Sequence, residues 1–213
     1  MYRPQTDTWL LIQALYHAGI PSGARVLDMC TGTGALAIAA AGVGAGHVTA
    51  VDISRRATLA TRFNARVRGL PVRVERRDAL SFPAARQFDV ILANPPYVPA
   101  PQGTLPRSGP SRAWDAARDG RALLDPLCVN ASGMLSSGGM LLVVHSAVCG
   151  VETTVDLLHR GGLKAAVVAR RTVPFGPVMN RRIPFLEEQG FIRAGQRHEE
   201  LVVIRGDRRN DPT

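Results

Sequence analysis

One stretch of sequence decides the fold: RVLDMCTGTG, residues 25–34. Its first half, residues 25–29, is a short and mostly apolar run, which predicts a buried β-strand. Its second half is a glycine-rich turn that opens a run of small residues, 34–41, which predicts a helix. Gly32 and Gly34 carry no Cβ atom, so they let the backbone approach a bound ligand closely. We therefore expect a ligand site where this strand ends.

Predicted strands and helices alternate outward from this stretch along almost the whole chain. Further strands are predicted at residues 47–53, 72–78, 88–93, 139–145, 165–173 and 199–205. Further helices are predicted at residues 7–19, 55–68, 121–135 and 151–159. Such alternation favours an α/β fold, a doubly wound Rossmann-like sheet of seven mostly parallel strands. The two closing strands break the alternation, which predicts a hairpin with one antiparallel edge strand.

Two proline-rich segments stand between these elements. Residues 95–120 are interpreted as a long loop, and loops of that length are usually functional. Residues 174–189 are interpreted as a proline-interrupted insertion between the last two strands. The inner face of the helix at residues 55–68 is expected to consist of Ala57, Leu59, Ala60, Phe63 and Val67. We expect a single domain over residues 1–206 and a polar tail over residues 207–213.

Composition places the chain among ordinary globular proteins. Its 213 residues are 46% hydrophobic and 20% charged, which suits one folded domain and excludes wholesale disorder. Its apolar runs fall far short of the ~20 residues that span a bilayer, and its first residues do not resemble a signal peptide. Three widely spaced cysteines argue against a disulfide framework, and the histidines show no metal-ligand spacing. We expect a cytoplasmic protein with no bound metal and no membrane partner.

The net charge of +9 comes almost wholly from arginine, with Lys164 as the only lysine. Nine arginines fall within residues 54–86, against only Glu75 and Asp78. This run fits a solvated helix face beside a charged strand edge. It also fits an electrostatic footprint for a nucleic acid or a ribosome-linked partner.

Two further signals lie at the predicted strand ends. Asp52 ends the second strand, where an acid can accept hydrogen bonds from ribose hydroxyls, although a nicotinamide or flavin cofactor would fit that pattern as well. The sequence Asn94-Pro95-Pro96-Tyr97 follows the fourth strand directly. The prolines stiffen the chain, so an Asn amide and main-chain carbonyls can project rigidly beside an aromatic ring. Such a site is suited to grip a planar NH2 group.

With these motifs the chain resembles the class I S-adenosylmethionine-dependent methyltransferases, specifically the HemK/PrmC-type N-methyltransferases that modify glutamine amides. Its first residues, Tyr2 to Thr8, are similar to the entry of the short, single-domain branch. The resemblance implies S-adenosylmethionine as cofactor and S-adenosylhomocysteine as product. It implies cofactor binding by Gln5, Thr6, Thr8, Asp28, Cys30, Thr31, Gly32, Gly34, Asp52, Ile53, Asp78, Ala79 and Asn94. It implies that Asn94, Pro95, Pro96 and Tyr97 hold the target nitrogen.

The sequence departs from the family pattern at Cys30, where the first glycine of the motif is usual. We therefore expect the turn to avoid, at this residue, a conformation that only glycine adopts. Asp119-Gly120-Arg121 is similar to the short family motif that follows the substrate loop. We expect the helical N-terminal domain of bacterial release-factor methyltransferases to be absent.

The expected partner is a protein substrate, a translation factor or ribosomal protein, and a small activator subunit, as in the eukaryotic short branch, is a further expectation to test. The alternatives are a nucleic-acid methyltransferase of the adenine N6 or ribosomal RNA type, a small-molecule methyltransferase of a biosynthetic pathway, and a cofactor-binding scaffold. Steep salt dependence of binding would favour the nucleic acid.

Other residues that often carry chemistry are expected to be structural. Cys128 and Cys149 are interpreted as small core residues. His145 ends the fifth strand and is expected near the pocket rim, whereas the remaining histidines are expected to be structural or solvated. The acidic pairs at residues 187–188 and 199–200 are interpreted as surface charge. Trp114 fits either an anchor of the substrate loop or a plain hydrophobic pin.

Overall fold

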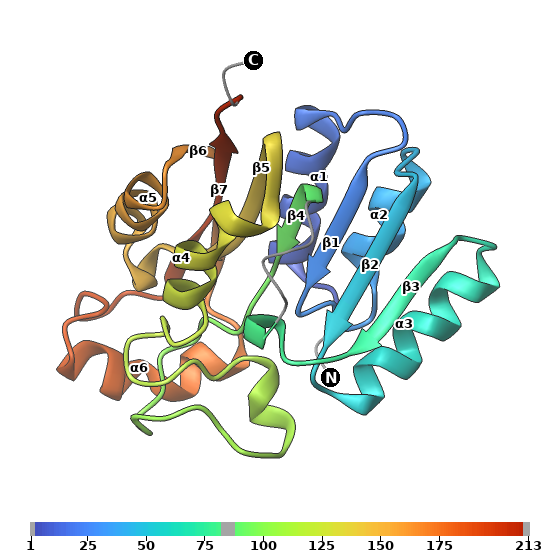
Figure 1. Ribbon diagram of the computed structural model, residues 1–213. Helices are drawn as coiled ribbons and strands as arrows, with labels where there is room; N and C mark the ends of the chain where they lie inside the picture. The colour runs from blue at the N-terminus through green and yellow to red at the C-terminus, as the bar shows by residue number, and fades with distance from the viewer. Residues whose placement is uncertain (1–2, 82–87, 211–213) are drawn as a thin grey trace.

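The computed structural model describes residues 3–81 and 88–210. Within them, one seven-stranded sheet runs in the order β3-β2-β1-β4-β5-β7-β6 (Figure 1). The strands are β1 (Arg25–Met29), β2 (His47–Asp52), β3 (Val72–Arg76), β4 (Phe88–Ala93), β5 (Leu135–Ser146), β6 (Leu163–Pro174) and β7 (His198–Arg208). The predicted doubly wound α/β fold is confirmed. The antiparallel strand is β7, which lies between β5 and β6 and so one place inside the sheet edge.

Helices cover both faces of the sheet, so the central strands are apolar on both sides. The helices are α1 (Thr6–Ala18), α2 (Ala35–Gly42), α3 (Arg55–Val67), α4 (Leu124–Met134), α5 (Val151–Arg160) and α6 (Pro177–Glu188). α1 and α2 pack on one face in a core that includes Val26 and Val90. α4 and α5 pack on the other face in a core that includes Leu27 and Ile91. No helix within the described ranges is long and apolar enough to cross a membrane.

α3 turns a different side inward from the one predicted. Its buried residues are Ala57, Thr58, Thr61 and Ala65, whereas Leu59, Phe63 and Val67 are exposed, Phe63 to 68%. The prediction of the inner face was therefore wrong for these three large residues. The reason is the close approach of α3 to the glycine-rich turn: a Cβ atom on Gly34 would stand 2.7 Å from the Thr61 side chain. Only small residues fit at that distance.

The segment expected to be a proline-interrupted insertion contains helix α6. Pro177 lies in the first turn of α6, where backbone N–H groups make no intrahelical hydrogen bond, so a proline loses none. Pro184 lies inside the helix. α6 has a small core of its own, built from Phe175, Met179, Leu186 and Ile192, against which Val98 packs. The strands around it are also longer than predicted, because β5, β6 and β7 pair along their lengths, and β7 extends to Arg208.

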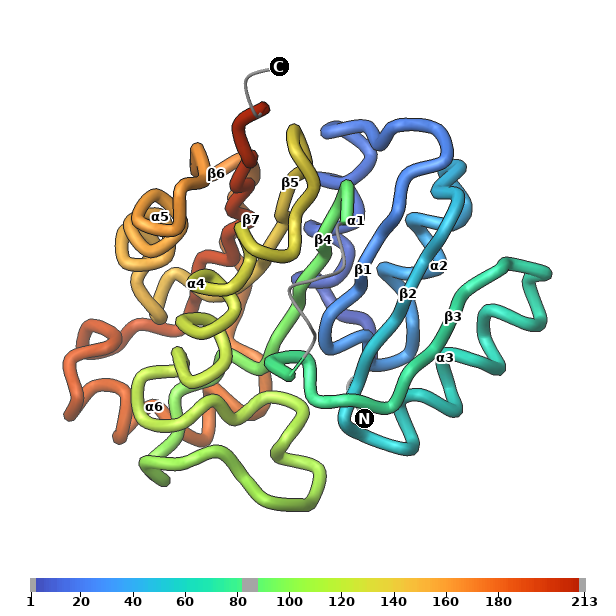
Figure 2. Tube along the Cα trace, in the orientation of Figure 1, coloured from blue at the N-terminus to red at the C-terminus, as the bar shows by residue number. Residues whose placement is uncertain are grey.

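The strand arrangement places the long loop after β4 at one end of the sheet. Figure 2 shows this loop, in light green, beneath the ends of β1, β2 and β4, with α6 beside it. β1 pairs in parallel with both β2 and β4. The carboxyl ends of these three strands therefore meet at the loop, and this is where parallel α/β sheets bind ligands.

Candidate active site

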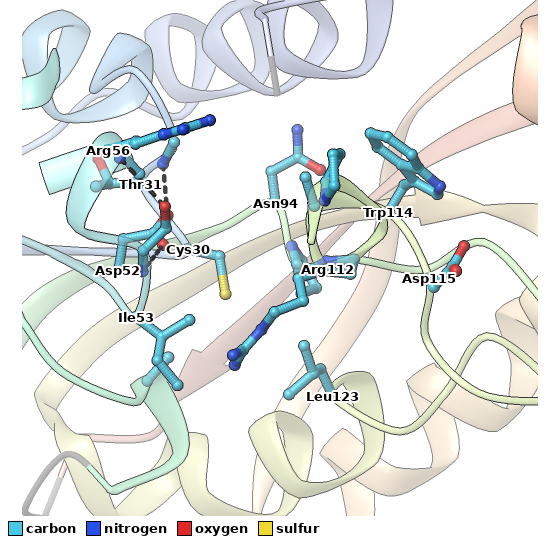
Figure 3. Close-up of a pocket in the computed structure, with 18 of the residues that line it drawn as sticks. Cys30, Thr31, Asp52, Ile53, Arg56, Asn94, Arg112, Trp114, Asp115 and Leu123 are labelled. Carbon is cyan, nitrogen blue, oxygen red and sulfur yellow. Dashed lines mark hydrogen bonds between the residues drawn. The ribbon is translucent and has the colours of Figure 1, made fainter. Parts of the chain in front are cut away.

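A pocket of about 600 Å³ opens at these strand ends (Figure 3). One wall is the glycine-rich turn after β1 together with the ends of β2 and β3. The opposite wall is the Asn94-Pro95-Pro96-Tyr97 segment, the loop at residues 105–115 and the first turn of α1. The pocket is large enough for a nucleoside-sized ligand with a second group beside it.

The glycine-rich turn is held from behind by Asp28. One carboxylate oxygen of Asp28 accepts hydrogen bonds from Thr31 Oγ1 and from the Ala37 backbone N–H, the latter at 3.0 Å. The other oxygen, Oδ1, is buried and has no hydrogen-bond partner among the described residues. Burial raises the pKa of Asp28 to about 7. Asp28 lies behind the pocket lining, so its direct effect is on the shape of the turn.

Cys30 adopts the conformation that the sequence argument excluded. Its φ is +60°, in the left-handed region that favours glycine, and such a backbone costs an L-residue about 1–2 kcal/mol. The expectation that the turn avoids this conformation was wrong. The thiol points toward the middle of the pocket, where Arg112 enters from the opposite side (Figure 3). Burial raises the pKa of the Cys30 thiol, so it stays protonated at neutral pH.

Asp52 joins the turn to the end of β2. Its Oδ2 accepts from the Gly32 N–H at 3.0 Å and its Oδ1 from the Ser54 N–H at 2.8 Å. Burial raises its pKa above the usual value for an aspartate. Ile53 lines the pocket beside it, and Asp78 lines it from the end of β3. A polar acceptor, an apolar side chain and a second acid in this order suit a ribose and a planar base.

The first turn of α1 is attached to the Asn94–Tyr97 segment. Asn94 Nδ2 donates to Thr8 Oγ1 at 3.3 Å, and Tyr97 Oη donates to Asp7 Oδ2 at 3.0 Å. The segment is supported from the other side by Cys149, whose Sγ donates to the Tyr97 carbonyl at 2.9 Å. Cys149 is thus buried as expected, but it also fixes the position of this carbonyl.

The Asp119-Gly120-Arg121 motif supports the same wall. Gly120 has a φ of +77°, and a Cβ atom there would stand 2.4 Å from the Tyr97 carbonyl oxygen. Arg121 is buried and donates from Nη1 to the carbonyls of Cys149 and Gly150. The motif therefore locks the turn after β5 against Tyr97.

α6 clamps the loop from outside. Arg182 forms an ion pair with Asp115 and donates to the Pro99 carbonyl at 2.8 Å. Val98 donates its N–H to the Trp114 carbonyl at 2.8 Å, which closes the loop on itself. Trp114 lines the pocket, so it belongs to the loop wall.

Most of the predicted site residues meet in this pocket. Those that line it are Thr8, Cys30, Thr31, Gly32, Asp52, Ile53, Asp78, Ala79, Asn94, Pro95, Pro96 and Tyr97. Asp28 and Gly34 lie behind the lining. Gln5 and Thr6 are outside it, and Pro4 and Asp7 line the pocket in their place.

Two expectations about titratable residues were wrong. His145 is fully buried rather than at the rim, and burial lowers its pKa to about 4. Glu199 is 8% exposed rather than a surface charge, and burial raises its pKa. Sequence reasoning also missed Asp7 and Arg182 as parts of the site. The Asp-Thr pair at the start of α1 was the one local signal for Asp7, and nothing local marks Arg182.

Comparison with known proteins gives consistent results. The family model of the methyltransferase small domain matches residues 3–105. A Methanocaldococcus jannaschii protein that carries the name protein N5-glutamine methyltransferase is 31% identical over 179 residues, which cover 84% of this chain and 89% of that protein. The release factor glutamine methyltransferase of Deinococcus radiodurans is 38% identical over 146 residues, 66% of this chain and 52% of its own. The chain thus spans about half the length of that second relative.

A likeness in fold extends to a solved complex. The E. cuniculi Mtq2–Trm112 complex, responsible for methylation of the translation termination factor eRF1, contains a chain that superposes with a TM-score of 0.67 at 22% identity. The superposition covers 97% of this chain and 98% of the other.

Proposed function

This chain belongs to the HemK/PrmC-type family of methyltransferases, and from that membership we propose that it transfers a methyl group from S-adenosylmethionine to the side-chain amide nitrogen of a protein glutamine. One observation carries the proposal. Asn94 uses its amide nitrogen to bond Thr8, which leaves its oxygen as an acceptor at the pocket beside the Pro95 carbonyl and the Tyr97 ring. An NH2 group offers two hydrogens to such acceptors and a flat face to such a ring.

The other half of the pocket fits S-adenosylmethionine. Asp28 lies behind the glycine-rich turn and holds it through Thr31 and Ala37, and the methionine part of the cofactor would lie against that turn. Gly32 allows the backbone to approach the methionine part. Asp52 would hold the ribose hydroxyls, and Ile53 and Asp78 would flank and bond the adenine. When bound, the cofactor supplies an electrophilic methyl group.

The residues of the chain then have to overcome one difficulty. An amide nitrogen is a poor nucleophile because its lone pair is delocalised into the carbonyl. Asn94 Oδ1 and the Pro95 carbonyl would accept hydrogen bonds from its two N–H groups, orient the nitrogen and stabilise the positive charge that develops on it until one of the two protons is released to water. Orientation of this kind contributes up to ~7–11 kcal/mol, and acceptors that are fixed before the reaction add a few kcal/mol. The two prolines keep these acceptors fixed.

The protein that carries the glutamine is proposed to be a translation factor or a ribosomal protein in the cytoplasm. The release factor relative supports this class, although that protein is about twice as long as the matched segment. The likeness to the Mtq2–Trm112 complex supports testing whether this chain also requires a small activator subunit.

A second candidate is methylation of an exocyclic amine in a nucleic acid, favoured by one observation. Exposed arginines gather on α3 and β3, at Arg55, Arg56, Arg62, Arg66, Arg68, Arg73 and Arg76. Such a surface is suited to phosphates.

The test uses tritiated S-adenosylmethionine, the purified protein and extract of its source cells. Asn94→Ala is expected to lower label transfer far more than it weakens the binding of S-adenosylhomocysteine. The matched control is Asn130→Ala on exposed α4 surface, which is expected to retain full transfer. Label that protease removes supports a protein acceptor, and label that nuclease removes would replace it with the nucleic acid. Full transfer by Asn94→Ala would refute the mechanism for either substrate.

A further inference from the structure

A single carboxylate at the start of α1 connects both ends of the Asn94–Tyr97 segment. Asp7 Oδ2 accepts from Tyr97 Oη at 3.0 Å. Asp7 Oδ1 accepts from the Thr8 N–H at 2.6 Å and from Thr8 Oγ1 at 3.2 Å. Thr8 Oγ1 in turn accepts from Asn94 Nδ2 at 3.3 Å. The hydrogen bonds thus run without a break from Asn94 through Thr8 and Asp7 to Tyr97.

The direction of these bonds follows from the chemistry of the groups. An ionised carboxylate only accepts, so the single hydroxyl hydrogen of Thr8 is committed to Asp7. The Thr8 oxygen can then only accept, and Asn94 can satisfy it only with its NH2 group. Asn94 is thereby held in one of its two orientations, with the amide nitrogen toward α1 and the oxygen turned away from it (Figure 3).

Burial makes this direction hard to change. Asp7 is 3% exposed and Thr8 is 5% exposed, so water has little access to substitute for a lost partner. A buried polar group left without a hydrogen bond is strongly disfavoured. The reversed Asn94 amide would place its oxygen against the Thr8 oxygen, two acceptors with no hydrogen between them.

We propose that Asp7 and Thr8 are positioning residues that fix Asn94 with its oxygen toward the substrate, and so select a target nitrogen that carries hydrogens over a target that can only accept them. The selection of the target nitrogen rests on the proposed function, because it matters only if Asn94 Oδ1 accepts a hydrogen bond from the target during transfer. The hydrogen-bond direction itself can be measured without any transfer.

The test compares Thr8→Val, which keeps the shape of the side chain and loses the hydroxyl, with Thr8→Ser, which keeps the hydroxyl. Label transfer from saturating tritiated S-adenosylmethionine into the acceptor of the cell extract gives the rate, and calorimetry with S-adenosylhomocysteine gives the cofactor Kd. We expect Thr8→Val to lower the transfer rate about 100-fold, the scale for loss of one fixed polar group in a catalytic site. We expect Thr8→Ser to restore most of it, with the Kd changed less than about threefold in both variants.

Thr58→Val is the matched control. Thr58 is equally buried, on α3 outside the pocket, and its hydroxyl bonds a carbonyl of its own helix. We expect this variant to transfer label at the wild-type rate. An unchanged transfer rate in Thr8→Val would overturn the proposal. So would a Kd that weakens as much as the rate falls, because Thr8 would then act on the cofactor.

The second readout needs no substrate. The side-chain NH2 signals of Asn94 in a 15N-labelled sample, assigned by their loss in Asn94→Ala, report the bond to Thr8. We expect them to shift in Thr8→Val and in Asp7→Asn and to return in Thr8→Ser. Signals that stay in place in Thr8→Val would overturn the hydrogen-bond direction, whether or not the wild type transfers label. If they shift and the wild type transfers nothing, the proposed function fails and the positioning stands.

Discussion

Gly120→Ala tests whether the wall of the target site is rigid. Gly120 has a φ of +77°, and the added Cβ would stand 2.4 Å from the Tyr97 carbonyl oxygen and 2.8 Å from Cys149 Sγ. Both neighbours are fixed, the carbonyl by the backbone and the sulfur by its bond to that carbonyl. The methyl group therefore has to push the wall toward the pocket.

The magnitude follows from two separate contributions. The left-handed backbone costs alanine about 1–2 kcal/mol, partly offset by about 0.4–1 kcal/mol from the less flexible unfolded chain. Overpacking against a fixed neighbour adds about 1–3 kcal/mol. Gly69→Ala isolates the first contribution, because Gly69 has a φ of +65° and nothing stands within 4 Å of its added Cβ. We expect Gly120→Ala to lose about 1–3 kcal/mol more than Gly69→Ala.

Urea unfolding of both variants measures this difference, and label transfer measures its effect on the site. We expect Gly120→Ala to transfer label more slowly and Gly69→Ala to match the wild type. Equal losses of unfolding free energy in the two variants, within about 0.5 kcal/mol, would show that the wall yields and that the argument from its rigidity is wrong.

Three further substitutions test other parts of the site. Asp52→Asn removes a charged acceptor from the proposed ribose position. We expect it to weaken S-adenosylhomocysteine binding about 10- to 100-fold, because hydrogen bonds to charged groups contribute about 1.5–3 kcal/mol. An unchanged Kd in calorimetry would show that Asp52 does not bind the cofactor. Arg182→Met leaves Asp115 buried without its cation and is expected to cost about 3–5 kcal/mol of unfolding free energy, whereas the exposed Arg181→Met costs less than about 0.5 kcal/mol; equal losses in urea would contradict the clamp. Asp28 holds its proton up to about pH 7 when folded but only to about pH 4 when unfolded, so its contribution to stability is full below pH 4 and falls as pH rises to 7. Asp28→Asn is expected to gain in unfolding free energy relative to the wild type across that range, and a difference that does not vary with pH would refute the buried proton.

The elements that position the site were predictable because their signals are local. The apolar runs that become β1, β2 and β4 are buried on both faces, and a strand of that kind is marked by its own composition. The glycine-rich turn and the Asn94–Tyr97 segment are each recognisable because their sequence signals lie in consecutive residues. The meeting of these two segments in one pocket at the strand ends was therefore predictable, whereas their roles toward cofactor and target stay predictions.

The errors arise where contacts with a part of the chain distant in sequence determine the local structure. Periodicity showed that α3 has apolar residues but not that the turn at Gly34 approaches Thr61 closely, so that α3 turns small residues inward and leaves Phe63 exposed. Arg182 and Asp115 are 67 positions apart, and Asp7 and Tyr97 are 90 apart. No local pattern marks such pairs. The prolines similarly concealed α6, because Pro177 and Pro184 disfavour a helix in a prediction made without knowledge of how the segment packs.

The sheet order also has a consequence for how the molecule is made. Residues 3–81 contain β1 to β3 and α1 to α3, and with them the glycine-rich turn and Asp52. The target side is added only when β4 pairs with β1, for example Val26 with Val90, across a long intervening segment whose closure carries an entropic cost. Asp7 is synthesised early and meets Tyr97 only at that stage. During synthesis from the N-terminus, the half of the pocket proposed to hold the methyl donor is thus available to form before the half proposed to hold the methyl acceptor exists.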